Sequence, residues 1–205
     1  MNSSLDRLRD AMARKGIPAL LVADPVSIGW LTGFTGSFAR VLLTENDARF
    51  ITDSRYTLQA KEQVPGMPLA SFASPTNGDV FVGQQAREMG IKRLAFESAS
   101  TTYAAYENMT SKMSEVELTP APDLFGELRM IKTPEEVEKI RRACAITDAC
   151  FSHLTRLIQP GLTEYDLQIE LEFYIRRAGA ADVELQLDLE VVLGQAGLDE
   201  AGKVA

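Results

Sequence analysis

The chain has 205 residues, of which 45% are hydrophobic and 24% are charged. These proportions exclude an intrinsically disordered chain, which combines low hydrophobicity with high charge. The net charge is −8, and an acidic chain repels the phosphates of nucleic acids. No apolar run approaches the roughly 18 residues of a membrane-spanning helix, and the first residues lack the pattern of a signal peptide. We therefore expect a protein that binds neither nucleic acid nor a membrane.

The cysteines and the single histidine bear on compartment and metal chemistry. Cys144 and Cys150 fall six residues apart in a predicted helix, which separates their Cα atoms by about 9 Å along its axis. A disulfide needs less than about 7 Å, so reduced thiols and a cytoplasmic location are expected. His153 lies within the same helix with no carboxylate three or four residues away, and we interpret it as a packing or surface residue. A zinc site built from several histidines of one chain is excluded.

Helical and strand patterns alternate over the first 118 residues. Leu5, Leu8 and Met12 recur at helical spacing. The apolar run 19–23 is typical of a strand buried on both faces, and residues 30–38 mix glycines with aromatics as in a tight loop. The later elements are predicted in the order strand 39–44, strand 48–52, helix 54–64, strand 69–72, helix 78–89, strand 93–96, helix 101–113 and strand 116–118. This order predicts an α/β fold with a mixed sheet and covering helices.

The alternating pattern stops near residue 120, which predicts a boundary between a first domain, 1–124, and a second unit, 125–205. Thr133, Pro134 and Glu136 form a strong helix start, and the helix is predicted to end near residue 157. A second helix over 163–179 completes a helical hairpin. Apolar and polar residues then alternate from 183 to 191, which is typical of a half-buried strand.

Two helices and one strand are too small to bury the apolar face of that strand. We therefore expect the second unit to be the start of a domain. It is expected to expose apolar surface on Leu167, Leu171, Leu187 and Leu189. Since large exposed apolar patches rarely stay unpaired, the chain is expected to form a homo-oligomer, most simply a dimer.

Four motifs, in order along the chain, resemble one known family. They are Trp30-Leu-Thr-Gly-Phe-Thr-Gly-Ser37, Phe50-Ile-Thr-Asp-Ser-Arg-Tyr56, Leu128-Arg-Met-Ile-Lys-Thr-Pro-Glu-Glu136 and the segment from Pro160 to Glu172. Together they resemble the Xaa-Pro dipeptidase and aminopeptidase P branch of the creatinase and metallo-aminopeptidase family. The resemblance covers about residues 1–180.

This resemblance implies a creatinase-type N-terminal domain with a ribonuclease-H-like fold, followed by the truncated start of a pita-bread catalytic domain. In the family, that domain holds two divalent metals, manganese or cobalt, on two aspartates, one histidine and two glutamates. The metals activate the water that attacks the peptide bond before proline. The segments that carry these ligands do not match any part of this chain. We therefore expect no metal ligands, no catalytic residues and no cofactor in this chain.

The resemblance also implies that loops of the N-terminal domain form a substrate entrance, often that of a neighbouring subunit. Trp30, Phe34 and Phe38 are candidates for its apolar walls, although large aromatics more often pack in a core. Arg40 and Arg55 are candidates for pairing with a substrate carboxylate. The alternative for Arg55 is a local ion pair with Asp53.

Three functions stay open on the sequence alone. The first is the N-terminal part of a Xaa-Pro peptidase, inactive alone, that serves dimerisation and substrate entrance. The second is a metal-dependent Xaa-Pro dipeptidase or aminopeptidase whose catalytic domain is supplied elsewhere. The third is a binding module for proline-containing peptides without chemistry.

Overall fold

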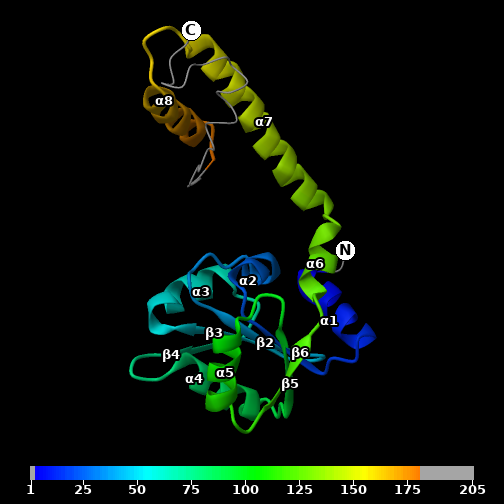
Figure 1. Ribbon diagram of the computed structural model, residues 1–205. Helices are drawn as coiled ribbons and strands as arrows, with labels where there is room; N and C mark the ends of the chain where they lie inside the picture. Colours follow the sequence, from blue (N-terminus) through cyan, green and yellow to red (C-terminus); the bar gives the residue numbers. More distant parts are fainter. Residues whose placement is uncertain (1–2, 181–205) are drawn as a thin grey trace. The chain divides into compact units, whose positions relative to one another are not determined.

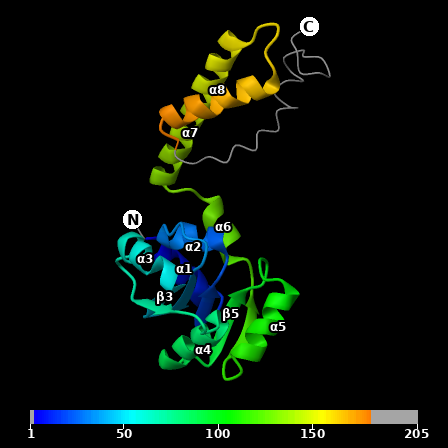
Figure 2. The same cartoon turned by 90° about the vertical axis from the view of Figure 1, so that its left-hand side faces the viewer.

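The computed structural model describes residues 3–180, which fall into two compact units (Figures 1 and 2). The first unit ends at Ile131 and the second begins at Lys132. The predicted strand over 183–191 lies outside the described residues, as do Leu187 and Leu189. Among residues 3–180, no helix is long and apolar enough to cross a membrane.

A six-stranded mixed sheet forms the centre of the first unit, in the order β4-β3-β2-β1-β5-β6. Five strands run in one direction and β2 runs against them, since β2 is antiparallel to both of its neighbours. The strands are β1 (Ala19–Val22), β2 (Arg40–Thr44), β3 (Ala48–Asp53), β4 (Leu69–Phe72), β5 (Arg93–Glu97) and β6 (Glu117–Ala121). The predicted α/β fold with a mixed sheet is therefore confirmed.

Helices cover both faces of this sheet (Figure 1). One face packs against α1 (Ser4–Arg14), α2 (Pro25–Thr32), α3 (Thr57–Gln63) and α6 (Leu124–Met130). The other packs against α4 (Gly78–Glu88) and α5 (Tyr103–Lys112). Successive side chains of a strand point to opposite faces, so Leu20 and Val22 enter the first core and Leu21 the second. The continuous apolar run of β1 follows from this burial on both faces.

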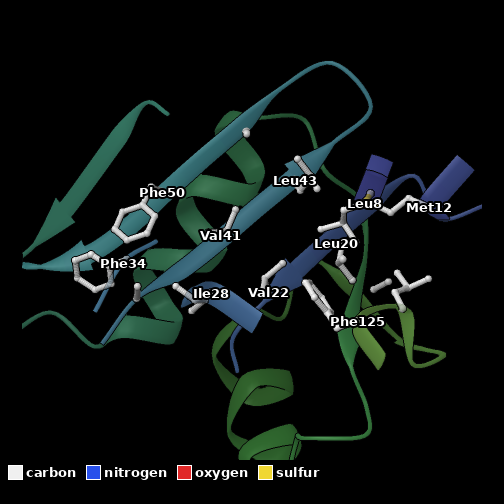
Figure 3. Close-up of a cluster of buried hydrophobic side chains, with 14 of the residues drawn as sticks. Leu8, Met12, Leu20, Val22, Ile28, Phe34, Val41, Leu43, Phe50 and Phe125 are labelled. Atoms are coloured by element: carbon white, nitrogen blue, oxygen red, sulfur yellow. The ribbon is translucent and has the colours of Figure 1, made fainter. Parts of the chain in front are cut away.

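Figure 3 shows the first of these cores. Leu8 and Met12 of α1, Ile28 of α2 and Phe125 of α6 lie over the side chains of the central strands. Phe34 stands against Phe50 of β3, with ring centroids 5.0 Å apart. This core fixes the positions of the loops at one end of the sheet.

Two helices of the first unit depart from the sequence prediction. The segment expected as a loop around Trp30 is partly helical, because Asp24 caps Ser27 N–H and Pro25 occupies the first turn of α2. Helix α6 lies in the stretch expected as a linker. It buries Leu124 and Phe125 in the first core, which is why the first compact unit extends to Ile131, beyond the predicted boundary at residue 124.

The described part of the second unit is a helical hairpin of α7 (Pro134–Leu157) and α8 (Glu164–Arg177). Both helices begin with a capping box, Thr133 with Glu136 in α7 and Thr163 with Asp166 in α8. Between the helices, Cys150 packs with the buried side chains of α8.

The expected exposure of two leucines in this hairpin was wrong. Leu167 and Leu171 are each only 5% accessible, and Leu171 packs in one cluster with Cys150 of α7. The exposed apolar residues of α8 lie on another stripe, at Tyr165, Ile169 and Phe173. Both cysteines are free, as predicted.

Candidate functional site

The carboxyl edge of the sheet gathers the candidate residues of the first unit. Because five strands run in one direction, their carboxyl ends meet at this edge, where the antiparallel β2 begins. Ligands of open α/β sheets usually bind outside the carboxyl ends of strands. Phe38, Arg40, Asp53 and Glu97 all belong to this edge.

Arg40 opens β2 and is half-buried beside Phe38. Its guanidinium carbon lies 4.8 Å from the centroid of the Phe38 ring. Nη1 donates hydrogen bonds to the carbonyl oxygens of Ala39 at 2.8 Å and Ala23 at 3.3 Å. Within residues 3–180, Nε and Nη2 have no hydrogen-bond partner, so one edge of this guanidinium keeps its donors.

Burial lowers the pKa of Arg40, and the nearby carboxylates of Asp79 and Glu97 partly offset that effect. Arginine stays protonated in proteins despite such shifts, so the group remains a cation. A planar cation with an unused pair of donors fits a carboxylate, which it binds through two parallel hydrogen bonds.

Arg55, unlike Arg40, forms an ion pair with a neighbouring carboxylate, that of Asp53. Its Nε and Nη2 donate to the two carboxylate oxygens of Asp53 at 2.9 and 2.8 Å. This pairing lowers the pKa of Asp53, and the side-chain hydrogen bond is the main cause. A substrate carboxylate would have to displace Asp53, so the geometry matches the alternative of a local ion pair.

The three aromatic candidates do not come together. Phe34 is only 3% accessible and packs on Phe50 and Tyr56, so it belongs to the core and forms no entrance wall. Trp30 packs edge-on against Phe125, with centroids 5.9 Å apart, and lies 5.5 Å from the Arg7 guanidinium. Phe38 packs instead on Phe72.

Two glycines allow the chain to make this arrangement after α2. Gly33 ends the helix with φ at +76°, a conformation that glycine adopts readily. A Cβ atom on Gly36 would lie 2.9 Å from Tyr56 Cδ1 and closer still to the Phe34 ring. The motif Gly-Phe-Thr-Gly therefore serves packing, and it delivers Phe38 and Arg40 to the edge.

Sequence reasoning missed Glu97, the last residue of β5. One carboxylate oxygen, Oε2, accepts hydrogen bonds from the backbone N–H of Ala23 at 2.7 Å and Asp24 at 3.0 Å. The Ser27 hydroxyl also hydrogen-bonds the carboxylate. Burial nevertheless raises the pKa of Glu97. The available signal was an acidic residue directly after the apolar run of a predicted buried strand.

A cavity of about 190 Å³ lies beside Glu97. The segments that follow β1, β5 and β6 form its walls, and Leu20, Leu124 and Phe125 contribute apolar surface. None of the residues predicted from the sequence lines it.

The described residues do not fit a metal centre. Across residues 3–180, no three side chains of His, Cys, Asp and Glu are placed to hold a metal ion. The His153 ring stacks on Tyr174 at 4.3 Å, which is the packing role expected for it.

Comparison with known proteins gives the family. Residues 5–131 match the creatinase/prolidase N-terminal domain family. The chain belongs to this family. Residues 138–191 match metallopeptidase family M24, so the resemblance found in the sequence is confirmed.

Individual relatives agree with this assignment. An uncharacterized peptidase of Bacillus subtilis, YqhT, is 36% identical over 86% of this chain and 49% of its own length. The structure of a Xaa-Pro dipeptidase from Bacillus anthracis matches with a TM-score of 0.78 and 34% identity, over 87% of this chain and 49% of that one. The N-terminal domain of the cytoplasmic peptidase PepQ from Mycobacterium tuberculosis matches with a TM-score of 0.55 and 29% identity, over 61% of this chain and 97% of that one.

The chain spans about half the length of the curated relatives it matches. The shared half contains the whole sheet domain and the helical hairpin.

Proposed function

We propose that this chain acts as the N-terminal part of a Xaa-Pro peptidase, in which Phe38 and Arg40 receive the carboxylate end of a proline-containing peptide at the substrate entrance. The observation that carries the proposal is the pair of unused donors, Nε and Nη2, on a half-buried guanidinium at the sheet edge. The family supports the substrate class, because its relatives include Xaa-Pro dipeptidases.

Recognition depends on how firmly the side chains of Phe38 and Arg40 are held in place. The Phe38 ring and the carbonyl oxygens of Ala23 and Ala39 hold the guanidinium in place before any ligand arrives. A carboxylate that binds Nε and Nη2 therefore restricts a side chain that is already ordered, which lowers the entropic cost of binding. The faces of Phe38 and its neighbour Phe72 offer apolar surface for a proline ring.

We assign no hydrolysis to this chain alone. We further propose that the protein is a cytoplasmic dimer. Two metals of the kind the family uses, manganese or cobalt, would be held by residues outside those described. The competing proposal is a complete metallopeptidase, which would release free proline.

Calorimetry with the dipeptide Ala-Pro tests the proposal on the 205-residue chain. We expect Ala-Pro to bind, and we expect its C-terminal amide to bind with about tenfold lower affinity or less, since the amide cannot form the charge-assisted pair. The variant Arg40→Gln should weaken Ala-Pro binding similarly. The matched control is Arg93→Gln, because Arg93 is an exposed arginine paired with Glu117 on the same sheet.

The same samples separate the competing functions. Free proline released in the presence of Mn²⁺ would replace the proposal with that of an active enzyme. Equal affinity for Ala-Pro and its amide, or for Arg40→Gln and the unaltered chain, would refute carboxylate recognition by Arg40.

A further inference from the structure

The cavity at the carboxyl ends of β1, β5 and β6 is distinct from the Arg40 site. By strand alternation, Arg40 shares a face of β2 with Leu42, on the side of α4 and α5, whereas Glu97 shares a face of β5 with Ala95, on the side of α2 and α6 where the cavity lies. Its volume of about 190 Å³ is below the roughly 300–1,000 Å³ of sites for drug-sized ligands, so it fits a ligand of few heavy atoms.

Glu97 supplies the charge of this cavity. No arginine, lysine or histidine within residues 3–180 forms an ion pair with its carboxylate. A half-buried carboxylate without a cationic partner is costly, and burial indeed raises the pKa of Glu97 although three groups donate hydrogen bonds to it. The negative charge is thus only partly compensated by the protein.

Each hydroxyl group in the cavity wall already donates its single proton to a hydrogen bond. Ser27 hydrogen-bonds Glu97, and Ser98 donates to the carbonyl oxygen of Ala121 at 2.7 Å. Ser100 donates to the carbonyl oxygen of Glu97 at 3.3 Å. Each hydroxyl keeps lone pairs but has no second proton to give. The remaining capacity of these groups is to accept hydrogen bonds.

The carboxylates at the mouth of the cavity add further acceptors. Asp24 accepts from Ser27 N–H at 2.9 Å, and Asp123 accepts from Gly126 N–H at 2.7 Å. Each carboxylate has about four acceptor positions, so most of them stay available. Arg129 is the one cationic residue of the lining, and it has an interaction partner of its own.

We infer that this cavity binds a small aliphatic ammonium compound, whose N–H groups meet Glu97 and the serine oxygens while its carbon atoms rest on Leu20, Leu124 and Phe125. An ammonium group donates three hydrogen bonds and accepts none, which complements a cavity that mainly accepts. The apolar floor selects a short hydrocarbon rather than a bare metal ion. The ligand is either a simple amine or the amino end of an amino acid.

Titration of the 205-residue chain with ethylammonium chloride, followed by backbone amide chemical shifts, tests this inference at constant ionic strength. We expect saturable shifts at residues 98–100, at Ala121 and at residues 123–126, and none with sodium chloride at equal concentration. Alanine and N-acetylalanine form the second comparison. If alanine shifts these residues and N-acetylalanine does not, the ligand class includes amino acids; if only ethylammonium binds, it is restricted to amines.

The key variants are Glu97→Gln and Ala99→Phe. Glu97→Gln removes the charge and should weaken ethylammonium binding by about tenfold or more. Ala99 is exposed in the turn after β5 and lines the cavity, so a phenylalanine there fills space without removing a hydrogen bond. Ala99→Phe should therefore weaken binding even if Glu97→Gln unfolds the protein.

Ala104→Phe, at an exposed alanine of α5, is the matched control and should change the affinity less than twofold.

Three results would overturn the inference: no saturable shift with any ammonium compound, equal shifts with sodium chloride, or unchanged affinity in Ala99→Phe. The test is distinguishable from that of the proposed function: Arg40→Gln removes a positive charge near Glu97, so it should not weaken ethylammonium binding, whereas it should weaken Ala-Pro binding. Failure of Ala-Pro recognition and failure of ammonium binding are thus separate outcomes.

Discussion

At the scale of single residues, the segment 30–38 contains a core residue and a half-buried residue that the sequence does not distinguish. Phe34 and Phe38 are both aromatic and stand four positions apart after α2. Phe34 is buried between Phe50 and Tyr56, whereas Phe38 stays half-buried beside Arg40. The difference arises from the turn at Gly36, whose contacts form only in the folded chain.

This difference gives a prediction for stability. Phe34→Ala should lower the free energy of unfolding by about 3–5 kcal/mol, because it removes a buried ring and leaves a cavity. Phe38→Ala should cost clearly less, since that ring is already partly in water. Urea denaturation followed by the fluorescence of Trp30, the single tryptophan and a residue of the same unit, measures both. Equal losses in the two variants would contradict the assignment of Phe34 to the core.

Glu97 gives a prediction for the pH dependence of stability. Its pKa is raised above 4.5 in the folded protein, so the folded state binds the proton more tightly than the unfolded state. The contribution of this group to stability is therefore most favourable at low pH, and it is lost as the pH rises from about 4.5 through the raised pKa.

Other carboxylates act in the opposite direction, since hydrogen bonds from Ser3 and Arg55 lower the pKa values of Asp6 and Asp53. The Glu97 contribution is isolated by comparing the chain with Glu97→Gln. We expect the stability of the chain minus that of the variant to increase as the pH falls from 7 toward 4.5. Urea unfolding across this pH range measures the difference in free energy of unfolding. A difference that shrinks as the pH falls would show that the pKa of Glu97 is lowered in the folded protein.

At the scale of elements, local patterns predicted most of the strands and long helices because burial acts on them directly. The run in β1 and the hairpin of β2 and β3 follow from side-chain alternation and turn residues. Helices α2 and α6 have only eight and seven residues and, unlike the equally short α3, each contains a glycine, which weakens the helical pattern in the sequence. Their caps, Asp24 and Asp123, were the readable signals.

The candidate site was predictable only in part for a related reason. Arg40 could be chosen as a cation near a Gly-rich loop, but its free donors depend on how β2 lies beside the end of β1. The environment of Glu97 depends on three segments that are far apart in the sequence. Such long-range pairings leave no local pattern, so the cavity was not evident beforehand, whereas the pairing of Arg55 with Asp53, two positions away, was an alternative that the sequence offered.

Helix α8 offers a test of an element that the sequence did predict. The Thr163 hydroxyl accepts a hydrogen bond from Asp166 N–H at 3.2 Å, and the Asp166 carboxylate accepts one from Thr163 N–H at 2.9 Å. Thr163→Ala should cost about 1 kcal/mol of helix stability, whereas Thr163→Ser keeps the hydroxyl and should cost much less. Amide hydrogen exchange in the first turn of α8 measures the loss. Equal protection in all three chains would exclude a stabilising cap.

At the scale of the whole molecule, the two units differ in how completely they bury their apolar side chains. The first unit has a core on each face of its sheet. The described part of the second buries Cys150, Leu171 and Ile175 in a small cluster of its own. Large apolar side chains remain exposed on both of its helices, at Ile140, Phe151, Tyr165, Ile169 and Phe173. We therefore expect self-association to involve this second unit.

The exposed stripe of α8 makes that expectation testable. Tyr165, Ile169 and Phe173 are spaced four residues apart, so they lie along one exposed side of the helix. Leu167 and Leu171, by contrast, are buried. We predict a dimer at micromolar concentration, which Ile169→Asp should convert to monomer because it places a charge in the apolar contact. Glu170→Gln, at an exposed neighbouring position, is the control and should stay dimeric. Light scattering at several concentrations gives the mass directly. A monomeric unaltered chain, or a dimer that survives Ile169→Asp, would mean that α8 does not form the interface.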